Sequence, residues 1–271
     1  MYSTELNAAK ELVIEAGRIV LKHYHGEVEV GLKKGAEPVT QADKDSNAFL
    51  TSQIAALFPE DGILAEESKD GAERLNKNRV WIIDPMDGTK EFIEKIGQFA
   101  VMVGLAVQGR PVAGVVYQPT TETLFYAEKG KGAFASRNGH VSKLQVSAIR
   151  EIPKMGMVVS RSHRSHLVTA IREALGITRE TGSGSVGLKV GLLAERTSDL
   201  YIHPNSKTKE WDTCAPQVIL EEAGGRMSDC WGAPLMYNKP NVYNARGFVA
   251  SNGLAHDEII RTMKPFLDTM D

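Results

Sequence analysis

The sequence predicts an α/β protein whose N-terminal half is α+β and whose C-terminal half is α/β. Three observations lead to this prediction. Apolar residues recur at three- and four-residue spacing over residues 4–24, which is typical of an amphipathic helix. Apolar segments with short polar breaks fill residues 99–136, as in an antiparallel meander. After about residue 150, strand-like and helix-like segments alternate, which favours an α/β unit.

The first half is expected to hold two helices and a series of strands. A second helix is predicted over residues 44–57, after a polar loop over 31–40, and Phe58-Pro59 ends it. The apolar run Val80–Ile83 suits a buried strand, and we expect Pro85 to stop it because proline cannot donate to a sheet. The meander is predicted to have strands over 99–107, 112–118, 123–127 and 132–136.

The second half alternates in a regular order, and no linker, repeat or low-complexity tract separates it from the first. We therefore divide the chain into residues 1–147 and residues 148–271. The predicted elements are a strand at 157–159, helices over 164–175 and 186–195, a strand at 200–202, a helix over 212–223, a strand over 246–250 and a helix over 256–268.

Composition excludes several classes of protein. The 271 residues are 42% apolar and 24% charged, which is ordinary for a globular chain. A formal charge of −2 gives no reason to expect nucleic acid as a partner. No apolar run reaches the roughly 18 residues of a membrane span, and acidic and basic residues interrupt the N-terminal segment, so we expect a cytoplasmic location. Two cysteines cannot build a disulfide framework or a four-cysteine zinc site.

The most informative stretch runs from Trp81 to Phe92. Asp84 and Asp87 lie three residues apart where a strand ends, and Pro85 and Gly88 permit a turn that aims both carboxylates at one point. Hard divalent cations prefer such oxygen ligands. An acidic surface turn is the alternative. A calcium loop of the EF-hand type fails, because its fifth and twelfth positions would be glycine and lysine.

Three further acidic segments are each more simply explained by a structural role when taken alone. Glu66 and Glu67 follow an apolar run, while Asp43 and Asp212 stand at predicted helix starts, where capping would account for them.

Together, the four acidic motifs resemble those of a known superfamily. They are Pro-Val-Thr-x-x-Asp at 38–43, Ala-Glu-Glu-Ser at 65–68, Trp-Ile-Ile-Asp-Pro-x-Asp-Gly-Thr at 81–89 and Trp-Asp-Thr-Cys-Ala-Pro at 211–216. The set is similar to that of the lithium-sensitive, magnesium-dependent phosphomonoesterases, which include inositol monophosphatases, fructose-1,6-bisphosphatases and 3'(2'),5'-bisphosphate nucleotidases. The resemblance implies a five-layered α/β/α/β/α sandwich with the site between the halves. Lys90-Glu91-Phe92 and Ser160-Arg161-Ser162-His163 resemble the nucleotidase branch.

The resemblance implies a set of ligands for magnesium, with two or three ions in each site. One ion would be held by Glu66, Asp84 and the carbonyl of Met86, and a second by Asp84, Asp87 and Asp212. Such ions stand between the carboxylates and the phosphate ester, which would otherwise repel each other, and they activate a water.

The resemblance also implies the catalytic and substrate-binding residues. Asp43 and Thr89 match the pair that takes a proton from the attacking water, and Glu66 touches both metal and water. The cleaved phosphate would lie on the N–H groups of Gly88 and Thr89. The remaining substrate contacts would come from Ser160, His163, Ser185, Lys189 and Asp212, with Lys33 or Lys34 lining the site. Lys189 is expected to pair with the phosphate that is not cleaved. A solvated helix face is the alternative for Lys189, and a surface position is the alternative for His163.

We therefore expect a phosphatase that converts adenosine 3',5'-bisphosphate to AMP and phosphate, with a small-molecule phosphate ester as its partner and a homodimer as an allowed state. An inositol monophosphatase or a fructose-1,6-bisphosphatase is the alternative on the same fold. A non-hydrolytic nucleotide-binding module is the alternative of a different class, because Gly182–Gly187 fits the dinucleotide fingerprint as a string. That reading is weakened by the preceding segment, which is a poor buried strand, and by Asp199, which comes early for the ribose-binding acid.

Overall fold

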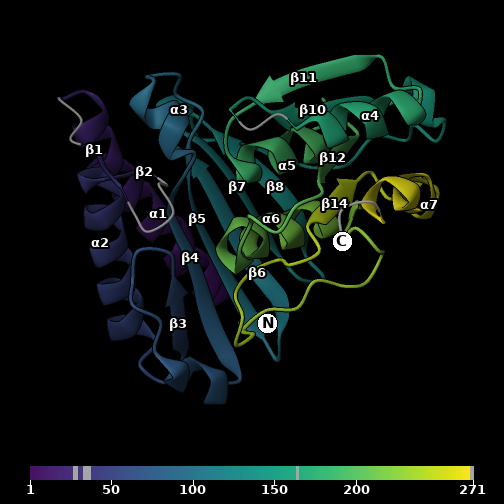
Figure 1. Cartoon of the computed structure of the whole chain (residues 1–271). Coiled ribbons are helices and arrows are strands. Elements are labelled where there is room, and N and C mark those ends of the chain that lie inside the picture. Colours follow the sequence, from purple (N-terminus) through teal and green to yellow (C-terminus); the bar gives the residue numbers. More distant parts are fainter. Residues whose placement is uncertain (27–29, 33–37, 163–164, 269–271) are drawn as a thin grey trace.

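The computed structural model describes residues 1–26, 30–32, 38–162 and 165–268. Its helices are α1 (Ser3–Tyr24), α2 (Gln41–Leu57), α3 (Thr89–Ile93), α4 (His166–Ala174), α5 (Val186–Ala194), α6 (Glu210–Glu222) and α7 (His256–Leu267). Figure 1 shows five layers: α1 and α2, a large sheet, α5 and α6, a smaller sheet, then α4 and α7. The predicted five-layered sandwich is confirmed.

Two sheets form the second and fourth layers. The larger has the strand order β3-β4-β5-β6-β7-β8-β9 and is antiparallel except for its first pair. The smaller has the order β11-β10-β12-β14-β13. Their strands are β3 (Gly62–Ala65), β4 (Arg79–Asp87), β5 (Ala100–Val107), β6 (Arg110–Gln118), β7 (Thr123–Glu128), β8 (Gly132–Arg137), β9 (His140–Lys143), β10 (Gly156–Ser160), β11 (Arg179–Ser183), β12 (Leu200–His203), β13 (Arg226–Ser228) and β14 (Phe248–Ser251).

Apolar periodicity explains the elements that the sequence predicted best. The buried face of α1 carries Leu6, Ala9, Val13, Ala16 and Val20, which are the residues whose spacing predicted this helix. They pack in one core with residues of β4, β5 and β6. The meander is also confirmed, since β5, β6, β7 and β8 pair in sequence order with antiparallel register.

Three expectations for the first half need correction. The second helix begins at Gln41 and not at 44. The segment predicted as a loop contains two short antiparallel strands, β1 (Val30–Leu32) and β2 (Pro38–Thr40). Strand β4 does not stop at Pro85 but continues to Asp87. β3 pairs with β4 only as far as Ile83, and the pairing with β5 is irregular beyond Asp84, so the missing N–H of proline breaks no regular ladder.

In the second half, the predicted alternation is confirmed, and two strands were missed. One is β13. The other is β11, which covers much of the segment judged a poor buried strand; it is a strand, but it lies at the sheet edge and is largely exposed. Exposure explains why its charged residues are tolerated.

Close packing of α6 onto the larger sheet brings the halves together. A Cβ atom on Gly104 of β5 would lie 2.6 Å from Sγ of Cys214, and one on Gly114 of β6 would lie 2.6 Å from the Ala215 carbonyl oxygen. Helix α6 also packs against β13 of the smaller sheet, so it contacts both sheets. The division of the chain into residues 1–147 and 148–271 stays a prediction. Among the residues that the structure describes, none of the helices is both long and apolar enough to cross a membrane.

Candidate metal and phosphate site

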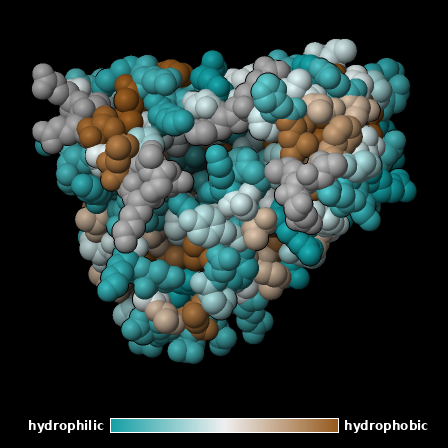
Figure 2. Space-filling model, viewed as in Figure 1, coloured by the Kyte–Doolittle hydropathy of each residue, from teal (hydrophilic) through white to brown (hydrophobic). Residues whose placement is uncertain are grey.

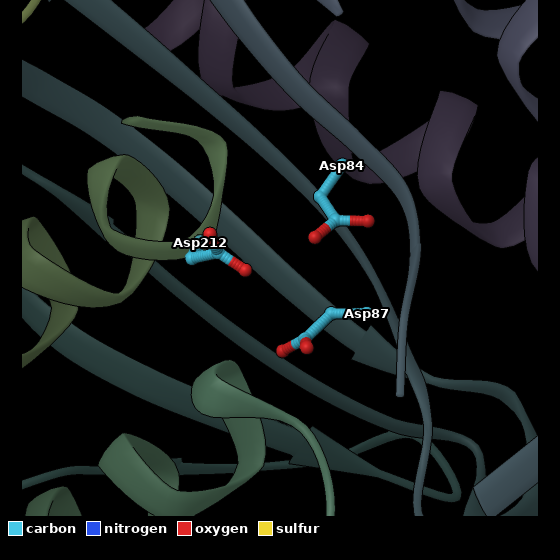
Figure 3. A group of neighbouring side chains, drawn as sticks. All are labelled: Asp84, Asp87 and Asp212. Carbon is cyan, nitrogen blue, oxygen red and sulfur yellow. The ribbon is translucent and has the colours of Figure 1, made fainter. Parts of the chain in front are cut away.

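Three carboxylates from distant parts of the chain meet beside the larger sheet. One oxygen of each of Asp84, Asp87 and Asp212 lies within 4.8 Å of one oxygen of each of the others. Figure 3 shows the three side chains turned toward a shared space, two from the end of β4 and one from the start of α6. Oxygen donors of this type and spacing fit a hard divalent cation such as magnesium.

A bulge in β4 places Asp84 and Asp87 on the same side of the strand. In a regular strand, residues three apart point to opposite faces. Here Asp84 pairs with Met102 and Asp87 with Ala100, so three steps along β4 match two along β5. The extra residue reverses the alternation. The Met86 N–H donates to Oδ1 of Asp84 at 3.0 Å, which holds the bulge in shape.

The turn after the bulge requires a glycine. Gly88 has a φ of +100°, a value that favours glycine. A Cβ atom there would lie 2.9 Å from the Gln98 carbonyl oxygen. Thr89, which begins α3, follows immediately. Its hydroxyl donates to Oδ1 of Asp43 at 3.2 Å, so the two residues predicted to deprotonate the attacking water are in contact.

Asp212 is fixed by the start of its own helix. It is the third residue of α6, and its Oδ2 accepts a hydrogen bond from the Lys209 N–H at 2.6 Å. A carboxylate in the first turn interacts favourably with the helix dipole. Asp212 therefore does cap the start of α6, which was the structural alternative for this residue. The same carboxylate also belongs to the group with Asp84 and Asp87.

Asp87 is held by the N-terminus of α5, a contact that the sequence analysis missed. Oδ2 of Asp87 accepts hydrogen bonds from the Ser185 hydroxyl at 2.6 Å, from the Val186 N–H and from the Gly187 N–H at 3.1 Å. Ser185, which was predicted to touch substrate, thus donates its hydroxyl hydrogen to Asp87. The glycine-rich segment 182–187 leads into α5, and the first N–H groups of this helix donate to Asp87. The segment therefore positions a carboxylate of the acidic group.

The electrostatics of the group favour a bound cation. Burial raises the pKa of Asp87, although the charge of Lys189 and the hydrogen bonds from α5 oppose the shift. Burial also raises the pKa of Asp212 well above its usual range, and the negative charges of Asp87 and Glu66 raise it further. Carboxylates that resist ionisation together are stabilised as anions when a cation lies among them.

Lys189 is buried and does not lie on a solvated helix face. Only 3% of the residue is exposed, and its ammonium group donates to the Ser183 carbonyl at 3.4 Å. The group also lies 5.2 Å from the centre of the Tyr201 ring. Burial lowers the pKa of Lys189 to about 8, while the charges of Asp87, Glu91 and Asp212 oppose that shift.

The other residues predicted for the site do not belong to the group of three carboxylates. Glu66 lies outside the group of three, yet its charge acts on Asp212. The Met86 carbonyl accepts from the Thr89 hydroxyl at 3.4 Å, and Ser160 ends β10. Lys33, Lys34 and His163 lie outside the described residues. On the face shown in Figure 2, a hollow opens in the region between α3 and α5, and those of its neighbouring residues that are coloured by hydropathy are mainly hydrophilic.

Comparison with known proteins gives a consistent result. The family model described as the inositol monophosphatase family matches residues 1–265. A 3'(2'),5'-bisphosphate nucleotidase CysQ of Aggregatibacter actinomycetemcomitans is 35% identical over 241 residues, which is 88% of this chain and 89% of that protein.

Solved structures of the same fold were also found. An IMPase of Thermotoga maritima has a TM-score of 0.82 and 26% identity, and the match covers 99% of this chain and 100% of that one. CysQ of Bacteroides thetaiotaomicron, described as a bacterial member of the inositol monophosphatase family, has a TM-score of 0.76 and 28% identity. That match covers 92% of this chain and 97% of that one.

Proposed function

The chain belongs to the inositol monophosphatase family, and from this premise we propose that it removes the 3'-phosphate of adenosine 3',5'-bisphosphate, giving AMP and inorganic phosphate. Like the other members of the family, it is a phosphoric monoester hydrolase. The observation that carries the proposal is the group of Asp84, Asp87 and Asp212 beside the contact between Thr89 and Asp43. Relatives named 3'(2'),5'-bisphosphate nucleotidase direct the choice of substrate.

Magnesium is the cation that this donor set suits. The proposed ligands are Glu66, Asp84, the Met86 carbonyl, Asp87 and Asp212, and two or three ions for each site are part of the proposal. When bound, magnesium neutralises the phosphate ester and makes water more acidic. Without it, a dianionic ester would approach three carboxylates that already repel one another.

The chain itself supplies the path for a proton. The Thr89 hydroxyl donates to Oδ1 of Asp43 at 3.2 Å, so Oγ1 of Thr89 can accept a proton from water while passing its own to the carboxylate. Oδ2 of Asp43 accepts hydrogen bonds from the N–H and the hydroxyl of Thr40 at 2.6 and 2.7 Å, which fix the carboxylate in place. Asp43 and Thr89 are therefore the proposed proton-transfer pair.

Substrate contacts complete the proposal. The cleaved phosphate would be bound by the N–H groups of Gly88 and Thr89, and the nucleoside by residues of the C-terminal half, among them Ser160 and His163. A cytoplasmic location and a homodimeric state belong to the same proposal. Light scattering after size-exclusion chromatography would measure the oligomeric state.

Phosphate release from a small panel of esters tests the function. The panel is adenosine 3',5'-bisphosphate, inositol 1-phosphate and fructose 1,6-bisphosphate, each with and without magnesium, for the wild type and Asp84→Asn. We expect magnesium-dependent release that is fastest with the bisphosphorylated nucleotide and nearly absent in the variant. A preference for the inositol ester would contradict the proposed substrate. No release from any ester, with tight dinucleotide binding, would favour a non-hydrolytic module.

A further inference from the structure

A pocket with charged lining residues lies beside Thr89, one of the two residues of the proposed proton-transfer pair. It has a volume of about 340 Å³. Lys90 and Ile93 of α3 and Glu94, which follows that helix, line one side, and Arg161 and Ser162, which follow β10, line the other. Lys90 and Arg161 carry the positive charges of this lining and Glu94 a negative one, while the carboxylate of Glu91 contacts Ser162. The exposed guanidinium of Arg161 is the group in this lining that is best suited to an anion.

Both walls of this pocket connect directly to the proposed site. On one wall, Lys90 follows Thr89, whose hydroxyl contacts Asp43. On the other, Nε of Arg161 donates to Oε1 of Gln98 at 3.0 Å, and the Gly184 N–H donates to the same oxygen at 2.9 Å. Gly184 precedes the serine whose hydroxyl holds Asp87. A substrate with one phosphate at the acidic group can thus extend toward the pocket.

The guanidinium of Arg161 is held in a defined orientation. Besides the bond to Gln98, its Nη2 donates to the Gly182 carbonyl at 3.0 Å. Within the described part of the chain, no hydrogen-bond acceptor is found for Nη1. The Ser162 hydroxyl donates to Glu91 of α3, which ties the two walls together. A planar guanidinium that is fixed on one edge and open on another is well suited to binding phosphate.

Lys189, the residue expected to pair with the second phosphate, is less suited to that task. Its ammonium group is buried, and the negative charges of Asp87, Glu91 and Asp212 act on it. Its positive charge therefore already stabilises carboxylates of the site. An incoming phosphate would have to compete with three anions for a group that is 3% exposed, whereas Arg161 is exposed at the pocket.

We propose that Arg161, with Lys90 across the pocket, binds the phosphate that is not hydrolysed and thereby sets the preference for a bisphosphorylated nucleotide. The inference rests on the proposed function. It assigns Arg161 a role in substrate selection, and it assigns Lys189 a role in balancing the charge of the acidic group.

Two substrates that differ only in the second phosphate test the proposal. Adenosine 3',5'-bisphosphate and adenosine 3'-phosphate carry the same scissile group on the same nucleoside. Arg161→Gln is expected to lower kcat/KM for the bisphosphate by roughly 10- to 100-fold, mainly through KM, because a charge-assisted hydrogen bond is lost. Activity on the monophosphate should change by less than about twofold. Arg161→Lys should recover part of the loss.

Two further variants serve as controls. Arg18→Gln removes one positive charge from an exposed position on α1, so both substrates should be hydrolysed as by the wild type. Lys189→Met should lower kcat/KM for both substrates by a similar factor. An unchanged melting temperature of Arg161→Gln would show that the fold is intact.

The outcomes separate this inference from the function itself. Equal losses of Arg161→Gln on both substrates, or a preference for the bisphosphate that the variant retains in full, would overturn the role of Arg161. If the wild type hydrolyses both nucleotides equally well, no residue recognises the second phosphate, and the role of Arg161 is overturned. The phosphatase function would still stand. If the wild type hydrolyses neither nucleotide but does hydrolyse inositol 1-phosphate, it is the proposed function that fails.

Discussion

Asp43 and Asp212 occupy the same position in two different helices. Each is the third residue of its helix, and each accepts a 2.6 Å hydrogen bond on Oδ2 from the N–H of the residue before the helix, Thr40 in one case and Lys209 in the other. This bond stabilises the helix start and restricts the side chain. Oδ1 of Asp43 then accepts from Thr89. Capping a helix and serving the site are two uses of the same carboxylate.

Metal binding should raise the thermal stability of the protein. Magnesium is expected to raise the melting temperature of the wild type, because a ligand that binds only the folded state adds about 2.7 kcal/mol at one hundred times its Kd. Asp212→Asn should lose most of this rise. In EDTA it should be as stable as the wild type or more stable, because burial and neighbouring charges oppose ionisation of Asp212. Thermal unfolding across a magnesium titration measures both effects.

Asp45→Asn is the matched control for that experiment. Asp45 lies on α2 and pairs with His23 near the surface, so its variant should keep the full magnesium response. A response of Asp212→Asn equal to that of the wild type would remove Asp212 from the ligand set.

The parts of the fold that the sequence could predict are those whose signal is local. The apolar spacing of α1 and the order of β5 to β8 are properties of neighbouring residues. The continuation of β4 through Pro85 depends on β3 ending its pairing at Ile83, which no local pattern reveals. β11 was missed as a strand because it lies at an exposed edge, where burial leaves no apolar pattern.

The site shows the same division. The acidic motifs identified Asp84, Asp87 and Asp212, whose residue types carry the chemistry. The contact from Ser185 to Asp87 joins residues 98 positions apart, and the burial of Lys189 follows from how α5 lies between the sheets. A serine directly before a predicted helix was the one available signal, since such a residue commonly caps a helix; its bond to Leu188 confirms that role here.

Close packing of α6 predicts a sensitive glycine. In Gly114→Ala, the new Cβ would lie 2.6 Å from the Ala215 carbonyl oxygen and 2.6 Å from Cγ1 of Val218. Because the helix backbone must move, we expect a loss of about 1–3 kcal/mol in the free energy of unfolding. Urea unfolding measures it. Gly182→Ala is the control, as no heavy atom lies within 4 Å of its Cβ position. Equal stability of the two variants would contradict this packing.

Stability should also depend on pH through His256. Its two ring nitrogens lie 2.8 Å from the hydroxyl oxygens of Ser228 and Ser251, and the residue is 1% exposed. Burial, helped by the charge of Arg226, lowers the pKa of His256 from 6.5 to about 4. Between these values the unfolded chain binds the proton and the folded chain does not, so stability falls as the pH falls from 6.5 to 4.

The contribution of His256 can be isolated by substitution. The full loss below pH 4 is up to about 3 kcal/mol. His256→Gln should be less stable than the wild type at pH 7.5, but the difference should shrink toward pH 5. Urea unfolding of both proteins at several pH values measures the difference, from which the carboxylates common to both cancel. A difference that stays constant with pH would show that His256 does not titrate in this way.

The proton path through Thr89 gives the most direct test of the chemistry. Thr89→Ala keeps all the carboxylates but removes the hydroxyl that donates to Asp43. Loss of general-base assistance lowers a rate by a factor on the order of 10²–10⁴, so kcat should fall by that range on every substrate the enzyme accepts. The magnesium-dependent rise in melting temperature should remain.

Thr89→Ser separates the hydroxyl from the rest of the side chain. Serine retains the oxygen and loses only a methyl group, so we expect it to keep most of the rate. Comparing kcat of the threonine, serine and alanine proteins at saturating magnesium therefore assigns the effect to one atom. If the serine and alanine variants lost activity equally, the methyl group and its packing would matter and the hydroxyl would not. The water's proton would then have to pass directly to a carboxylate, and Glu66 is the candidate, because the family resemblance implies that it touches both metal and water.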